Sequence, residues 1–185
     1  RPFIQTRCCM ATARLRIGFR ADAVHGKTWA KRGKTPVINR PGQRQSISAA
    51  SAGNAKGAFW FATYEGGLTG ELFVDLLKQL MYRRKKPLHL VVDGLPAHKK
   101  AVVKEYVTNS EGRLTLHFLP GYAPDLNPDE LVWSHAKRTG VARKPLMKGE
   151  KLQERVHEQL QKIGENKKLV RSFFKLPSVA HISDC

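Results

Sequence analysis

The sequence of 185 residues has little cysteine and no long apolar run, and both absences restrict the class of protein. Its cysteines, Cys8, Cys9 and Cys185, stand at the two ends without CxxC spacing. This arrangement predicts neither a disulfide framework nor a zinc site, and it fits a reducing compartment. No run approaches the ~18 apolar residues that cross a bilayer, and residues 1–10 lack the apolar stretch of a secretory signal. We therefore expect a cytoplasmic protein without a membrane partner.

Acidic residues are also scarce. Lys and Arg number 33 against 15 for Asp and Glu, which gives a formal net charge of +18 at pH 7. Because the basic residues are spread along the whole length, they are typical of a globular basic protein and not of a basic tail. This excess favours a polyanionic partner, with nucleic acid ahead of an acidic membrane surface. A structural nucleic-acid-binding protein without chemistry would carry the same charge.

The first quarter of the sequence changes character near residue 17. Residues 1–16 show neither a period of two nor a period of 3.6, and we expect an irregular segment there. Short β-type pieces follow over residues 26–39, and residues 45–50 and 57–64 have the pattern of an antiparallel meander.

Helices alternate with strands from residue 70 onward. The expected segments, in chain order, are a helix over Gly70–Met81, a strand over Leu88–Val92, a helix over residues 99–107, a strand over Leu114–Phe118, a helix over residues 127–137 and a helix over residues 150–163. The order predicts an α/β fold, in which a mixed sheet has an antiparallel meander, then parallel strands, and helices on its faces. We expect one domain over residues 17–145, followed by a C-terminal helix and tail over residues 146–185.

Asp93 directly follows the apolar strand that ends at Val92. Ligands of open α/β sheets gather at the carboxyl ends of strands, which makes Asp93 a candidate catalytic residue and metal ligand. The dipeptide Asp93-Gly94 is equally typical of a turn, so a purely structural role stays open.

Three further side chains have both a chemical and a structural interpretation. Asn127 has the pattern of a helix N-cap, with Pro128 in the first helical position. Glu130 either completes a capping box with Asn127 or binds a metal ion. His98 either orients a nucleophile or a metal-bound water, or makes a structural hydrogen bond.

Basic residues around Gly33 form a candidate phosphate-binding hairpin, although an exposed basic hairpin would have the same sequence. Trp29 and Trp133 are expected in the core. The residues that we expect to contact nucleic acid are Lys31, Arg32, Lys34, Lys99, Lys100, Lys137 and Arg138.

Two stretches are more specific than these patterns: VVDGLPAHKKAVVKEY (residues 91–106) and LTLHFLPGYAPDLNPDELVWSHAKR (residues 114–138). They resemble the signature of insertion-sequence transposases of the DDE endonuclease superfamily, relatives of mariner-type transposases. DAVHGKTWAKRGKTPV (residues 22–37) resembles the segment after that family's first catalytic strand, so the resemblance spans about residues 19–138. It implies an RNase H-like fold, DNA strand cleavage and transfer, transposon ends and target DNA as partners, and a location at the nucleoid. It leaves a homodimer open.

The same resemblance assigns metal-binding acids. The family brings three acids together, and Asp93 matches the second and Glu130 the third, 37 positions apart in the sequence. Two Mg²⁺ (or Mn²⁺) ions, roughly 3.5 to 4 Å apart, would activate water or a 3′-hydroxyl and stabilise the leaving oxygen. Oxygen ligands favour these ions over zinc. Asn127 and His98 match motif positions near the site, but the resemblance gives neither a definite role.

The first acid of the family does not have a counterpart. It belongs to an Asp-Glu pair a few residues before the Phe19-Arg20 dipeptide, and counting back gives Leu15 and Arg16, neither of which is acidic. Asp22 is the only acid before Glu65. A slipped register in which Asp22 serves is the one substitute that the sequence offers.

We therefore expect a degenerate transposase catalytic domain, and the sequence leaves open whether it is still an enzyme. One hypothesis is that residues 1–16 are truncated or out of frame; the coding DNA read one base over would then encode an Asp-Glu pair after an apolar strand. The alternatives are a non-catalytic basic DNA-binding protein, and a barely folded chain that lacks its central strand. A replacement strand over residues 14–20 would allow the chain to fold despite the loss of the original central strand.

Overall fold

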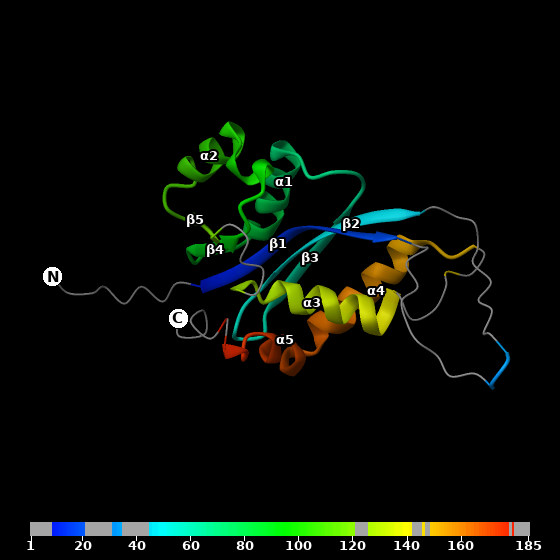
Figure 1. Cartoon of the computed structure of the whole chain (residues 1–185). Coiled ribbons are helices and arrows are strands. Elements are labelled where there is room, and N and C mark those ends of the chain that lie inside the picture. The colour runs from blue at the N-terminus through cyan, green and yellow to red at the C-terminus, as the bar shows by residue number, and fades with distance from the viewer. Residues whose placement is uncertain are drawn as a thin grey trace.

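The computed structural model describes residues 9–20, 31–34, 45–120, 126–141, 146, 149–177 and 179, with the backbone alone for residues 9–17 and 141. Five strands form one mixed sheet in the order β3-β2-β1-β4-β5 (Figure 1). The antiparallel half consists of β1 (Cys9–Arg20), β2 (Ser46–Gly53) and β3 (Phe59–Tyr64). The other half consists of β4 (Leu88–Val92) and β5 (Leu114–Phe118), which run parallel to β1. β1 is thus the central strand.

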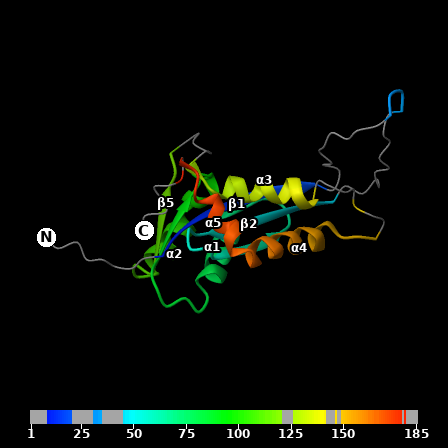
Figure 2. The same ribbon diagram turned by 90° about the horizontal axis from the view of Figure 1, so that it is seen from below.

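Helices cover both faces of the sheet (Figures 1 and 2). On one face lie α1 (Gly70–Met81) and α2 (Ala101–Thr108), the latter after a 3₁₀ turn, Pro96–Lys99. The other face carries α3 (Asp129–Ala136), α4 (Leu152–Glu165) and α5 (Lys167–Phe173). A π-helical turn, Lys137–Val141, extends α3. Among the described residues, no helix is long and apolar enough to span a membrane.

The sheet separates two hydrophobic cores. The core under α1 and α2 is built on Phe73, Leu77 and the apolar side chains of β4. The core under α3, α4 and α5 contains Trp133, whose ring centroid lies 5.7 Å from that of Phe19 on β1. Trp133 is therefore a core residue, as predicted, and it fixes α3 against the central strand.

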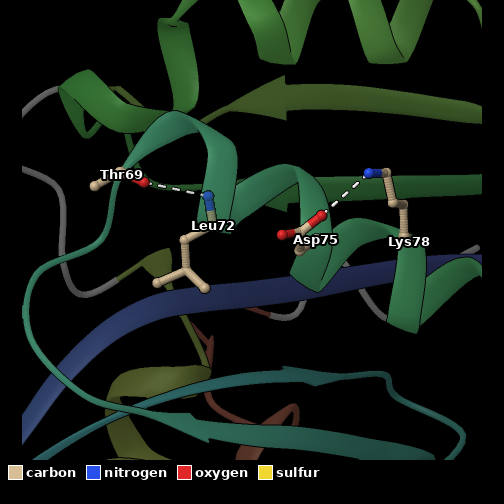
Figure 3. Close-up of polar contacts among 4 residues, drawn as sticks. All are labelled: Thr69, Leu72, Asp75 and Lys78. Atoms are coloured by element: carbon tan, nitrogen blue, oxygen red, sulfur yellow. Dashed lines mark hydrogen bonds and ion pairs between the residues drawn. The ribbon is translucent and has the colours of Figure 1, made fainter.

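Helix α1 shows how local sequence signals and packing agree. The Thr69 hydroxyl accepts a hydrogen bond of 3.2 Å from the Leu72 N–H and so caps the first turn (Figure 3). The outer face carries the Asp75–Lys78 ion pair at 3.1 Å. Leu76, Leu77 and their apolar neighbours on the inner face are buried against the sheet, because their spacing repeats the helical period.

Most predicted elements are present, and the predicted fold class is confirmed. The prediction of irregular structure was wrong for residues 9–16, because β1 begins at Cys9 and pairs with strands on both sides. The sequence analysis did not predict α5, and it predicted that α2 begins at residue 99, two residues before its observed start at Ala101. Residues 1–8, Trp29 and the β-type pieces expected over residues 26–39, apart from the turn at 31–34, lie outside the described residues.

Candidate functional site

The parallel strands β4 and β5 end at the same level of the sheet, and Asp93 leaves the sheet there. Val92 pairs with Phe118 of β5 on one side and with Ala13 of β1 on the other. The side chain of Asp93 keeps 30% of its surface exposed, although it follows a buried strand. A carboxylate is therefore accessible at the carboxyl end of the sheet, where ligands of such sheets bind.

A buried histidine fixes this carboxylate. His98, in the 3₁₀ turn after β4, has its Nδ1 2.7 Å from the backbone oxygen of Asp93 and 3.1 Å from Asp93 Oδ1. A carbonyl oxygen only accepts, so Nδ1 carries the proton and donates it along the shorter contact. Oδ1 of Asp93 stays in electrostatic contact with the ring, without a hydrogen bond of its own among the described residues. His98 thus holds the backbone of Asp93 by a hydrogen bond and lies against its carboxylate.

The central strand has an irregularity where the first acid was expected. Arg14 pairs with Ser51 and Ile17 pairs with Ala49, so two residues of β1, Leu15 and Arg16, lie opposite one residue of β2. This β-bulge lies just past the level at which β4 ends. Bulges of this kind occur next to active sites, where they change the direction of a side chain.

Asn127 makes the bonds expected of a helix cap. Its Oδ1 accepts from the Asp129 N–H at 3.1 Å, and its backbone oxygen accepts from the Glu130 N–H at 3.0 Å. The regular helix α3 begins at Asp129, yet helical hydrogen bonding begins at Asn127, a difference within the usual ambiguity of helix ends. Glu130 therefore lies in the first turn, as predicted.

The two adjacent acids of α3 have different surroundings. Asp129 is fully buried, and its Oδ1 and the ring of Phe174 both lie close to Gly53 at the end of β2. Glu130 is only half-buried. Since α3 packs against β1 and β2, Glu130 is the acid of the pair that keeps access to solvent beside the central strand.

The basic residues fall into separate groups. Lys31, Arg32 and Lys34 are exposed on a tight turn, in which the Lys34 N–H donates to the Lys31 oxygen at 2.9 Å and Gly33 has a φ of +82°. Lys99 and Lys100 are exposed next to His98. The third group, Lys137 and Arg138, is exposed on the turn that extends α3.

The structure brings two pairs of the candidate residues together: Asp93 with His98, and Asn127 with Glu130 through their backbones. Asp93 and Glu130 offer the oxygen ligands that Mg²⁺ and Mn²⁺ prefer. However, the described part of the chain contains no group of three acidic, histidine or cysteine side chains that could hold a metal ion. The donors thus have the right chemistry, but the set is short of the three acids that the resemblance implies.

One residue at this end of the sheet was not singled out by its sequence. Phe118 alternates with Leu114 and Leu116 as a residue of an amphipathic strand would, yet 46% of its surface is exposed. Its position as the last residue of an edge strand, next to the charged segment 98–100, is the signal that could have identified it.

The strand order and the helices on both faces define an RNase H-like fold. The model of the DDE superfamily endonucleases matches residues 16–153, well over half of the chain, and the chain belongs to this family. The match includes both Asp93 and Glu130, and it begins at Arg16, the second residue of the β1 bulge.

Solved structures of a mariner transposase share the fold. The mariner Mos1 paired-end complex with Mg has a TM-score of 0.65 at 14% identity, over 95% of this chain and 56% of that one. The Mos1 paired-end complex with the left transposon end has a TM-score of 0.62 at 14% identity, over 95% and 55%. The Mos1 catalytic domain with Raltegravir and Mg has a TM-score of 0.56 at 14% identity, over 95% of this chain and 84% of that one. The chain spans about half the length of the Mos1 chains in the two paired-end complexes. No curated protein matches the sequence.

Proposed function

We propose that this chain is a transposase catalytic domain that binds DNA, with transposon ends and target DNA as its ligands and the nucleoid as its location, and that its strand-cleavage chemistry is impaired. The family membership and the solved complexes of Mos1 with transposon-end DNA support the DNA partner. The net charge of +18 supports it independently.

The bulge of β1 is the observation that carries the second half of this proposal. The position expected for the first acid holds Leu15 and Arg16, at the level of Asp93. Divalent ions, when bound, supply a Lewis acid and an activated water, and several carboxylates must converge to hold them. The Mos1 complexes with Mg and with Mn suggest such ions for this family fold. Among the described residues only Asp93 and Glu130 match the family's acids, and Asp22 lies outside them, so we expect DNA affinity to survive and cleavage to be lost.

Binding and nicking of the same labelled duplex separate the two activities. The unmodified chain should bind the duplex but should not nick it with Mg²⁺ or Mn²⁺. Nicking that disappears in Asp93→Asn, and persists in the matched exposed-acid control Asp75→Asn, would show that the site is still active. Absence of DNA binding would contradict the whole proposal.

Restoring the missing acids provides the complementary test. The double substitution Leu15→Asp with Arg16→Glu should create Mn²⁺-dependent nicking from an undetectable background, because it supplies the third carboxylate. Adding Asp93→Asn to this variant should abolish the gain. A double variant that folds and binds DNA, but does not nick, would contradict the assignment of the first acid to this position.

A second candidate function, a DNA-binding protein without any metal site, is favoured by the cap at Asn127. The bonds from the Asp129 and Glu130 N–H groups to Asn127 give the start of α3 a structural explanation that needs no metal. Glu130→Gln discriminates, because a first-turn residue should lose less than about 1 kcal/mol of unfolding free energy. A metal ligand should instead lose Mn²⁺ affinity, which calorimetric titration measures.

A further inference from the structure

Phe118 differs in position from the other exposed large apolar side chains. Among the described residues these are Tyr82, Phe118 and Leu176, with exposures of 70%, 46% and 41%. Phe118 lies at the end of the sheet where Asp93 lies, since it pairs with Val92. An aromatic face is thus open to solvent next to the candidate catalytic acid.

Lys99 lies between Phe118 and the turn that follows Asp93. Its Nζ lies 5.8 Å from the ring centroid of Phe118. The same ammonium group approaches the turn after Asp93, because a Cβ placed on Gly94 would be 3.5 Å from Lys99 Nζ. A positive charge and an aromatic face therefore stand together beside the carboxylate, within the range of a cation–π contact.

A cleft of about 580 Å³ opens beside this pair, between α2 and β5. Apolar side chains of both elements form much of its wall, and its charged residues among those that the structure describes are Lys99 and Lys104, with no acidic side chain in that set. Its volume is in the range of sites that hold small organic groups. The charge of the lining suits an anionic ligand with a flat apolar part.

We propose that Phe118, Lys99 and this cleft bind one unstacked nucleotide of DNA beside Asp93. The base stacks on Phe118, its phosphate contacts Lys99, and the apolar wall of the cleft receives the edge of the base. A paired base inside a duplex has both faces covered by its neighbours, so the ligand is an overhanging or frayed strand end. The inference rests on the proposed DNA partner and adds a preference for an unpaired nucleotide at the site.

The test compares two oligonucleotides that differ in one unpaired 2-aminopurine at the end of a duplex. The full chain should bind the overhanging form more tightly and quench its fluorescence by stacking. Phe118→Ala and Phe118→Leu should weaken binding of the overhanging DNA by about 5- to 100-fold and leave the blunt duplex unaffected. Phe118→Trp should retain the preference. Tyr82→Ala is the matched control, because Tyr82 is an exposed aromatic residue with Arg83 at 5.2 Å from its ring.

Each outcome has a distinct meaning. Equal binding of the two DNAs by the unmodified chain, or equal losses in Phe118→Ala and Tyr82→Ala, would overturn the nucleotide site while the proposed function stands. Loss in Phe118→Ala that Phe118→Leu repairs would also overturn it, because leucine lacks a stacking face. Failure of the unmodified chain to bind either DNA would contradict the proposed function itself.

Discussion

At the scale of single residues, the setting of Asp93 depends on one imidazole ring. His98 is 1% exposed, and its ring centroid lies 4.5 Å from that of Phe73 in the core under α1. The ring therefore has little freedom, and its Nδ1–H is aimed at the backbone oxygen of Asp93. We propose His98 as a positioning residue that restricts the carboxylate of Asp93.

Replacing this ring by a phenyl group separates packing from hydrogen bonding. His98→Phe keeps an aromatic contact with Phe73 but leaves the Asp93 oxygen without its donor, so it should lower the free energy of unfolding by about 1 to 3 kcal/mol. Urea titration measures the change. His157→Phe is the control, because exposed His157 contacts the ring of Phe61 at 5.1 Å and should change stability by less than about 0.5 kcal/mol.

If His98 positions the carboxylate of Asp93, its replacement should also change metal affinity, which a stability measurement does not report. In the variant with acids restored at positions 15 and 16, His98→Phe should lower the Mn²⁺ affinity at a temperature where both proteins are folded. Unchanged affinity would leave His98 with a structural role only.

At the scale of elements, the turn between β2 and β3 docks onto α5 through a glycine. Gly57 has a φ of +87°, and a Cβ there would lie 2.9 Å from the backbone oxygen of Lys167. The Arg171 Nε–H also donates to the Lys56 oxygen at 3.1 Å. The close approach is between backbones, which cannot yield as a flexible side chain does.

Gly57→Ala should therefore cost more than left-handed backbone strain alone, which is about 1 kcal/mol. We expect a loss of about 2 to 4 kcal/mol of unfolding free energy. Gly66 has a φ of +76° with open space around it, so Gly66→Ala reports the strain without the clash. Equal losses in the two variants, measured by thermal or urea unfolding, would contradict the docking contact.

The start of α1 carries the clearest electrostatic signature of an element. The hydrogen bond from the backbone N–H of Glu71, then that from the Thr69 side chain, and the charge of Lys100 hold the pKa of Glu71 below its usual range. A carboxyl whose pKa is lower in the folded state stabilises the fold above the unfolded pKa. This stabilisation is lost as the pH falls through the folded pKa.

Glu71→Gln should accordingly be less stable than the unmodified chain at neutral pH and equal to it well below pH ~4. Melting temperatures across this pH range measure the convergence. Glu65→Gln, an exposed acid outside the helix, is the control. A difference that is the same at every pH would show that Glu71 acts through packing instead of charge.

The elements differ in how well their sequences predict them, and the reason is physical. Gly70–Met81 was predicted to the residue, because its apolar spacing and the burial of its inner face coincide. The sequence did not predict β1 over residues 9–16. A central strand is fixed by backbone hydrogen bonds to two neighbouring strands, and such a strand need not show an alternating side-chain pattern. At the site, the positions of Asp93 and Glu130 follow from strand and helix ends. The contact of His98 with Asp93 and the exposure of Phe118 depend on tertiary packing.

At the scale of the whole molecule, a net charge of +18 leads us to expect that the proposed DNA binding weakens as salt is added. Each phosphate neutralised on a duplex changes the slope of log K against log salt by about 0.9. The double variant Lys137→Gln with Arg138→Gln should reduce that slope by about 1 to 2, if both residues contact phosphates.

The control is Lys78→Gln, because Lys78 is engaged with Asp75 on the outer face of α1. Titrations between 50 and 200 mM salt, with labelled duplex, give the slopes. An unchanged slope in the double variant would remove these two residues from the DNA-binding surface.

The bulge in β1 also has an evolutionary consequence. Pairing with β2 holds β1 before and after the bulge, at Arg14 and at Ile17, and pairing with β4 ends at Ala13, so Leu15 and Arg16 themselves have no partner in the ladders. Mutations there can therefore silence catalysis without exposing the gene product to proteolysis. Under the proposed function, selection for a foldable protein would not remove such mutations, and a chain that binds DNA without cutting it would persist as a folded competitor of active relatives.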